Sequence, residues 1–102
     1  ARDAPYEAAR ISVTHSLPHM YRARRAPRAE KELAKLPRQI QIRVRASFSA
    51  IAKNPLLGKP LKGVLAGAYS VYIWPYRIVY APFYKEKVVI VLRVRRRKDM
   101  YR

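Results

Sequence analysis

Arginine, lysine and tyrosine side chains are grouped at the C-terminal end of the sequence, where they could act on a phosphate. Residues 95–98 are all cationic, and Tyr101 follows them. An arginine guanidinium suits a phosphate because its planar fork can bind two oxygens at once. A tyrosine, whose pKa is normally about 10, can take part in proton transfer where nearby cations lower that pKa. The grouping therefore makes phosphate chemistry available to this chain.

Histidine and serine chemistry is disfavoured by where these residues stand. His15 and His19 both lie in the first nineteen residues, which differ in pattern from the rest of the chain. A two-histidine ribonuclease is therefore not expected. A serine triad is not expected either, because Ser47, Ser49 and Ser70 have no histidine partner between residues 20 and 102.

Acidic residues and glycines are too few or wrongly spaced for a metal or nucleotide site. Glu30 and Glu32 are two apart on a predicted helix and so point in different directions. The other acids after residue 19 are Glu86 and Asp99, and there is no cysteine. The three glycines do not have the spacing of a phosphate-binding loop. The sequence therefore predicts neither a metal nor any other cofactor.

An RNA substrate could supply its own nucleophile, because its 2′-hydroxyl can attack the neighbouring phosphate. The protein must then deprotonate that hydroxyl, stabilise a more negative phosphorane and help the leaving oxygen to depart. Positioning and electrostatics can supply most of this. The same reasoning predicts a slow catalyst unless the substrate is presented in a strained geometry.

The charge balance indicates a polyanionic partner. The 102 residues include 23 Lys and Arg but only 6 Asp and Glu, which gives a net charge of +17. Such a charge repels itself in the folded state, and nucleic acid is the first candidate to balance it. A membrane partner is disfavoured, because the most apolar run, Val88–Leu92, is far too short to span a bilayer.

The first nineteen residues are predicted to lie outside the folded domain. They are neutral overall, show no sustained period and end in Pro18-His19, which together with Met20 forms a Pro-His-Met stretch typical of a cloning junction. We interpret residues 1–19 as a disordered leader or cloning-derived tail; the alternative is a natural extension that orders on a partner. Residues 20–102 then form one domain and carry the whole charge. The lack of cysteine fits a reducing, cytoplasmic compartment.

Two helices are predicted near the start of this domain. Pro27 suits the first turn of the first helix, and Pro37 ends it. The second helix covers residues 38–53 and ends at Asn54-Pro55. Its apolar stripe consists of Ile40, Val44, Phe48 and Ile51.

Extended segments are predicted on both sides of the helices. A short strand over residues 21–26 precedes them, and a loop over residues 56–67 follows. Three strands are then expected over residues 68–74, 76–83 and 88–95. The order strand–helix–helix–three strands predicts an α+β fold, with two helices packed on a small, mostly antiparallel, twisted sheet.

Several short motifs resemble the RelE family of bacterial and archaeal toxins. They are residues 29–33 (AEKEL), Asn54-Pro55, Leu61-Lys62-Gly63, residues 76–80 (YRIVY), the strand at 87–94 and residues 97–101 (RKDMY). Their order and spacing match the family over essentially residues 20–102. The resemblance implies a compact α+β toxin that cuts messenger RNA in the A site of the small ribosomal subunit. It also implies a cognate antitoxin that neutralises the toxin.

The resemblance implies roles for individual residues. Arg77 would stabilise the transition-state phosphate, and Arg97 would stabilise or protonate the leaving group. Tyr101 would orient or deprotonate the attacking 2′-hydroxyl, and Lys62 would lie in the basic surface that faces RNA. Further RNA contacts are expected from the basic end of the last strand, at Arg93, Arg95, Arg96 and Lys98.

Some positions depart from the family pattern. Ser70 and Tyr72 stand where members that cut RNA often carry basic residues, which weakens the apparatus for proton transfer. Arg96 stands where many relatives have histidine, so a cation is kept. Tyr72 and Trp74 could stack on bases, although packing on the sheet is the simpler interpretation.

Two other functions stay open on the sequence. A ParE-type member of the same superfamily shares the fold but acts on DNA gyrase, and Ser70 and Tyr72 favour it. Arg77, Arg97 and Tyr101 together favour RNA cleavage. A non-catalytic ribosome or RNA binder would use the charge for affinity alone.

Overall fold

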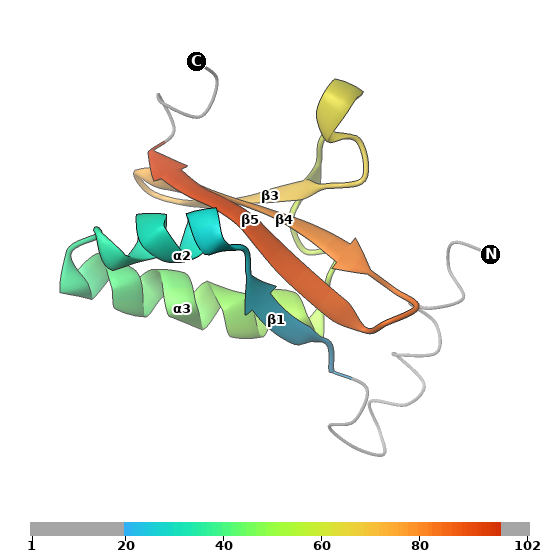
Figure 1. Ribbon diagram of the computed structural model, residues 1–102, viewed down its shortest axis with the longest axis horizontal. Coiled ribbons are helices and arrows are strands. Elements are labelled where there is room, and N and C mark those ends of the chain that lie inside the picture. The colour runs from blue at the N-terminus through green and yellow to red at the C-terminus, as the bar shows by residue number, and fades with distance from the viewer. Residues whose placement is uncertain (1–19, 97–102) are drawn as a thin grey trace.

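Five strands form a single sheet, and two helices pack on it (Figure 1). The computed structural model describes residues 20–96. In chain order the elements are β1 (Arg22–Arg25), α2 (Pro27–Ala34), α3 (Arg38–Lys53), β2 (Lys59–Pro60), the 3-10 helix η2 (Gly63–Leu65), β3 (Tyr69–Ile73), β4 (Tyr76–Phe83) and β5 (Val88–Arg96).

The sheet has the strand order β1-β5-β4-β3-β2. β1 runs parallel to β5, and all other neighbouring strands are antiparallel. The predicted α+β fold with a mostly antiparallel sheet is thus confirmed. The loop expected over residues 56–67 is wrong in part, because Lys59 and Pro60 pair with the start of β3 as a short fifth strand.

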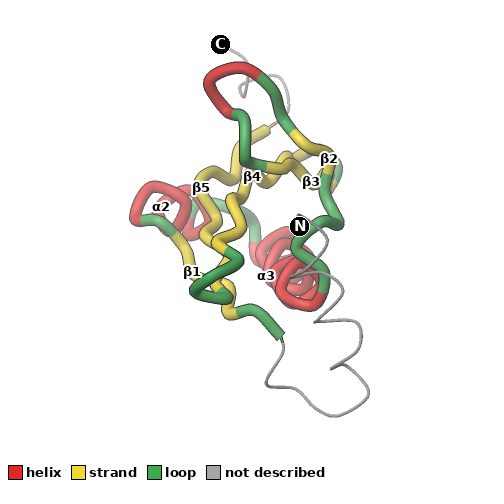
Figure 2. Tube along the Cα trace, turned by 90° about the vertical axis from the view of Figure 1, so that its right-hand side faces the viewer, coloured by secondary structure: helices red, strands yellow, loops and turns green. Residues whose placement is uncertain are grey.

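The helices follow their apolar spacing. α2 begins at Pro27, where the missing backbone N–H costs no helical hydrogen bond, and it buries Ala29 and Leu33, four residues apart. α3 buries a stripe that includes Val44 and Phe48. Both helices contact β1 and β5, and Figure 2 shows them packed around that side of the sheet. β4 adds Ile78 and Tyr80 to the core that the helices cover, and Tyr69, Val71 and Ile73 of β3 pack against that core.

Tyr80 ties the segment before β2 to the middle of the sheet. Its side chain is fully buried on β4 and stacks on the Tyr69 ring. Its hydroxyl donates to the Pro55 carbonyl oxygen and accepts the Gly58 N–H, each at 2.8 Å. Burial raises the pKa of Tyr80, so the hydroxyl keeps the proton that it donates to Pro55. Two hydrogen bonds thus fix the chain immediately before Lys59.

Gly58 is required at this point because of a close backbone approach. A Cβ added there would lie 2.7 Å from the Ser70 carbonyl oxygen and 3.0 Å from the Tyr80 hydroxyl. Carbonyl oxygens of a paired strand cannot retreat without breaking the sheet. The absence of a side chain therefore lets β2 lie close enough to pair with β3.

We expect Tyr80→Phe to destabilise the fold while leaving its packing volume almost unchanged. The Pro55 carbonyl and the Gly58 N–H would lose their partner inside the protein, which costs about 1–3 kcal/mol. Equilibrium urea unfolding measures this difference. Tyr72→Phe, at an exposed ring, is the matched control and should unfold at the wild-type midpoint. Equal midpoints for the two variants would contradict the role given to the Tyr80 hydroxyl.

Candidate functional site

Three side chains line up across β3, β4 and β5 and form what we call the Arg77 row. Tyr72 is the register partner of Arg77, and Arg77 is the register partner of Arg95. Directly opposed residues share a face of the sheet. Two predicted site residues from different strands are therefore brought side by side, with an aromatic ring next to them.

A bulge in β5 decides which face its arginines occupy. Val79 pairs with Arg93 but the next residue, Tyr80, pairs with Val91, so Leu92 is left without a register partner. Tyr80 and Val91 are fully buried. Without the extra residue, strict alternation would carry positions 93 and 95 into the same buried face as Val91. The bulge turns both arginines toward the face that holds Arg77.

Arg77 is held in a defined orientation. Its guanidinium carbon lies 4.9 Å from the centre of the Tyr72 ring, a distance typical of a cation–π contact. One of its terminal nitrogens, Nη1, donates to the Ser70 hydroxyl at 3.3 Å. Ser70 and Tyr72, the two positions that depart from the family pattern, are thus both in contact with the Arg77 guanidinium.

One carboxylate, that of Glu32 in α2, organises the arginines of β5. It accepts hydrogen bonds from Nη2 of Arg93 and from the backbone N–H of Val94, both at 2.8 Å, and lies 3.8 Å from Nε of Arg95. β1 pairs with β5 only as far as Val91. The Glu32 carboxylate therefore takes the place of a neighbouring strand at Val94 and holds Arg93 at the same time.

The electrostatics of the Arg77 row favour an added anion. Like charges directly opposed on neighbouring strands repel one another, and this applies to Arg77 and Arg95. The Glu32 carboxylate lies closer to Arg93 than to Arg95, at 2.8 Å and 3.8 Å respectively. An anion beside the row would lower the repulsion between the two guanidinium groups. Guanidinium groups held side by side in this way are suited to binding phosphate oxygens.

Lys59 joins the site from a strand that the sequence does not predict. It is the register partner of Ser70, which pairs with Val79, which pairs with Arg93. This line across four strands, which we call the Lys59 row, lies next to the Arg77 row. Position 70 is a serine and carries no charge, but the Lys59 cation of β2 stands beside it. A two-residue strand shows no periodicity, so nothing in the sequence could have indicated it.

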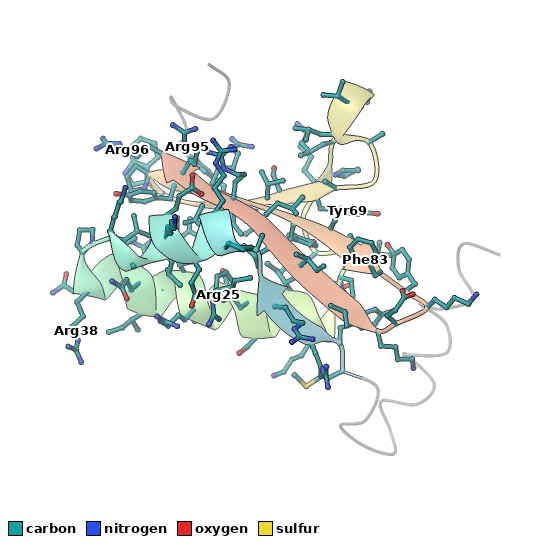
Figure 3. All side chains as sticks on the ribbon, in the orientation of Figure 1. Arg25, Arg38, Tyr69, Phe83, Arg95 and Arg96 are labelled. Atoms are coloured by element: carbon teal, nitrogen blue, oxygen red, sulfur yellow. The ribbon has the colours of Figure 1, made fainter. Side chains whose placement is uncertain are left out.

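The remaining predicted residues are placed less centrally or lie outside the described part. Lys62 is exposed at the start of η2, in the segment that projects from the sheet in Figure 1. Arg96 pairs with Tyr76, so alternation turns it to the opposite face from Arg95. Figure 3 shows both arginines at the C-terminal end of β5. Residues 97–102, with Arg97, Lys98 and Tyr101, lie outside the described residues.

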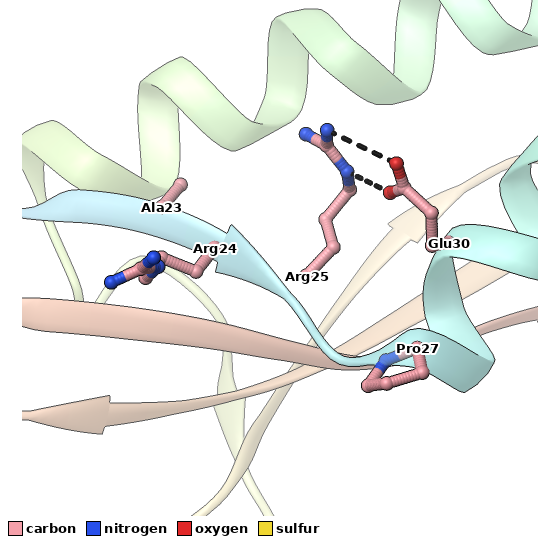
Figure 4. A pocket seen from close by; sticks show the side chains of 5 residues that line it. All are labelled: Ala23, Arg24, Arg25, Pro27 and Glu30. Atoms are coloured by element: carbon pink, nitrogen blue, oxygen red, sulfur yellow. Dashed lines mark hydrogen bonds and ion pairs between the residues drawn. The ribbon is translucent and has the colours of Figure 1, made fainter.

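A separate surface pocket of about 410 Å³ lies where β1 meets α2 (Figure 4). It is lined by Ala23, Arg24, Arg25, Pro27 and Glu30. The Arg25 guanidinium hydrogen-bonds the Glu30 carboxylate, and this bond holds the pKa of Glu30 below its ordinary value. Arg25 also lies 5.9 Å from the centre of the Phe48 ring. The positive charge of Arg25 is therefore engaged by groups of the same domain, the Glu30 carboxylate and the Phe48 ring.

Other kinds of site find little support in the described part. Among residues 20–96, no three His, Cys, Asp or Glu side chains come together in a way that could hold a metal ion. In the same range neither helix is long and apolar enough to cross a membrane. The side chains that the two rows bring together are Arg77, Arg93, Arg95, Lys59, Ser70, Tyr72 and Val79.

Both the sequence and the fold match known toxins. The family of the ParE toxin of type II toxin–antitoxin systems, parDE, matches residues 23–101. The chain belongs to this family, within the RelE/ParE superfamily. Toxin RelG of Mycobacterium tuberculosis is 37% identical over 84 residues, which cover 80% of this chain and 97% of the relative.

Solved structures of related toxins share the fold. A chain of the toxin–antitoxin complex RelBE2 from Mycobacterium tuberculosis has a TM-score of 0.71 at 35% identity, over 76% of this chain and 92% of that one. The isolated RelE toxin of E. coli has a TM-score of 0.67 at 24% identity, over 74% and 83% of the two chains. The resemblance to RelE toxins is thus confirmed, and the protein is a toxin of the type II toxin–antitoxin class.

We expect Glu32→Gln to destabilise this toxin by about 1.5–3 kcal/mol, because hydrogen bonds to a charged group are lost at a half-buried position. Urea unfolding at low and high salt measures the effect, and salt should reduce the difference between variant and wild type. Glu30→Gln is the matched control, since it also removes an arginine partner, but on an exposed side chain, and should change stability much less. Equal losses of stability in the two variants would show that the Glu32 contacts with β5 do not stabilise the fold.

We expect Arg25→Gln to return the pKa of Glu30 toward its ordinary value, since the lowered pKa comes first from the Arg25 hydrogen bond. A carboxyl with a depressed folded pKa stabilises the protein above its unfolded pKa and loses this as pH falls through the folded pKa. NMR titration of the Glu30 side-chain carbon follows the change. Lys53→Gln removes the same charge elsewhere and should leave the titration of Glu30 in place; an equal shift would show a general charge effect.

Proposed function

We propose that this toxin is a metal-independent endoribonuclease that cleaves messenger RNA in the ribosomal A site. The observation that carries the proposal is the Arg77 row, in which two guanidinium groups from neighbouring strands occupy one face of the sheet. Transfer of a phosphoryl group to the 2′-hydroxyl next to it builds up negative charge on the phosphorane. Preorganised arginines are suited to stabilise that charge. The similarity to Toxin RelG and to RelE toxins supports the same reading.

The proposed division of labour follows the chain. Arg77, oriented by Ser70 and Tyr72, binds the scissile phosphate, and Arg95 adds to the field on its other side. Arg97 stabilises or protonates the leaving oxygen, and Tyr101 orients or deprotonates the attacking hydroxyl. These last two roles rest on the resemblance to RelE toxins. The ribosome supplies the strained substrate geometry that such a slow apparatus needs.

We further propose that a cognate antitoxin neutralises the toxin in the cytoplasm. The related Mycobacterium tuberculosis toxin was solved as a toxin–antitoxin complex. An unbalanced charge of +17 also favours a partner with acidic segments. Calorimetry with the protein encoded beside the toxin gene tests this partner, and a lack of binding would count against it.

Inhibition of DNA gyrase is the second candidate function. The matching family is that of ParE toxins, and Ser70 and Tyr72 stand where RNA-cutting members often have basic residues. Against this, Lys59 brings a cation to the side of Ser70. That placement supports RNA cleavage over gyrase inhibition.

Primer extension on a message translated by purified ribosomes tests the proposal. We expect wild-type protein to cut within A-site codons and Arg77→Ala to be about 10²–10³-fold slower, the usual cost of losing one stabilising group of this kind. Arg97→Ala and Tyr101→Phe should also be impaired. Arg24→Ala, an equal loss of charge on exposed β1, should cut at nearly the wild-type rate.

Two results would overturn RNA cleavage. If messages stay intact while gyrase supercoiling is blocked, the gyrase reading is right. If the toxin binds ribosomes without cleaving messages or blocking gyrase, it is a non-catalytic binder.

A further inference from the structure

An exposed aromatic pair extends the Arg77 row at the end of β3. The expectation that Trp74 packs on the sheet is wrong, because the residue is 66% exposed, and Tyr72 is 43% exposed. The two rings contact each other at 5.8 Å between centroids and nearly at right angles. Trp74 lies in the turn that follows β3, and its contact with the Tyr72 ring places the indole beside the face that holds Arg77. Aromatic surface of this size is left open to solvent.

The aromatic pair is continuous with the cations. The Arg77 guanidinium lies against the Tyr72 ring, Trp74 contacts the same ring, and Arg95 stands opposite Arg77. The line from Trp74 to Arg95 therefore runs from an exposed indole, through a tyrosine, to two guanidinium groups. Proteins that hold single-stranded nucleic acid combine these two parts, a cationic path for phosphates and rings on which bases stack.

We propose that Trp74, supported by Tyr72, is a stacking site for an unpaired base of single-stranded RNA whose phosphate lies at the Arg77 row. The choice of RNA as the occupant rests on the proposed function, and charge complementarity supports it. The indole offers a flat face to a base, while Tyr72 is clamped between Arg77 and Trp74 and fixes the distance from base to phosphate. Trp74 is then a substrate-positioning residue that helps to set the register of the strand over the arginines.

Trp74 is the only tryptophan in the chain, so its fluorescence reports on this site alone. The probe is a short 2′-O-methyl RNA, which keeps bases and phosphates but cannot be cut. We expect this strand to quench the fluorescence. An abasic strand of equal length and an RNA duplex should not, because the first has no bases and the second keeps its bases paired. Equal quenching by the abasic strand would overturn the proposal.

Affinities of labelled strands give the second test. We expect Trp74→Ala to bind the 2′-O-methyl strand on the order of tenfold more weakly and the abasic strand as well as wild type does. Its salt dependence should be unchanged, whereas Arg95→Ala should have a shallower one, because phosphate contacts release counterions and stacking does not. Trp74→Phe should recover most of the affinity. Phe83→Ala, at an exposed ring on the other end of β4, is the matched control and should bind normally.

The outcomes separate this inference from RNA cleavage. Normal affinity of Trp74→Ala, or an equal loss for the abasic strand, would show that Trp74 does not stack on a base, whether or not the toxin cuts. Quenching by an acidic peptide from the antitoxin and not by RNA would likewise overturn it and assign the rings to protein binding. If base-dependent quenching is seen but messages stay intact on ribosomes, stacking stands and the proposed cleavage falls.

Discussion

The bulge in β5 is the constraint on which the basic face depends. Val79 of β4 pairs with Arg93 and Tyr80 pairs with Val91, so Leu92 of β5 is an extra residue without a register partner. Before this point β5 sends valines into the core, and after it Arg93 and Arg95 point away from the core. A single extra residue thus lets one strand serve a dry core and a cationic surface in turn.

The Glu32 carboxylate stabilises the basic end of β5. Arginines crowded on neighbouring strands raise the free energy of the fold. On the edge of β5 that faces β1, strand pairing stops at Val91, although β4 still pairs with β5 on the other edge. The Glu32 carboxylate meets both needs, because it accepts the Val94 N–H and binds the Arg93 side chain. Arg93 is consequently part of the scaffold as much as part of any RNA surface. Arg77 and Arg95 stand opposite one another in the neighbouring Arg77 row.

Strands β2 and β3, at the opposite edge of the sheet from β1, add further residues to the same face. Tyr80 and Gly58 fix the chain before β2, so that Lys59 pairs with Ser70. Tyr72 carries the Arg77 guanidinium on its ring. Ser70 and Tyr72, which depart from the family pattern, therefore each have a cation from a neighbouring strand beside them. A site assembled in this way can keep its charge while individual positions change type.

The helices, the long strands and the kinds of chemistry open to the chain can be predicted from local sequence. Pro27 and the spacing of Val44, Phe48 and Ile51 act locally, and the shortage of histidine and acids leaves arginine, lysine and tyrosine as the reactive groups. Four other features depend on the folded arrangement of distant segments. Arg77 stands beside Arg95, Lys59 pairs with Ser70, Glu32 binds β5, and Trp74 is exposed. The reason is physical: which strands become neighbours, and in what register, depends on packing between residues far apart in the chain, and one bulge reverses the faces.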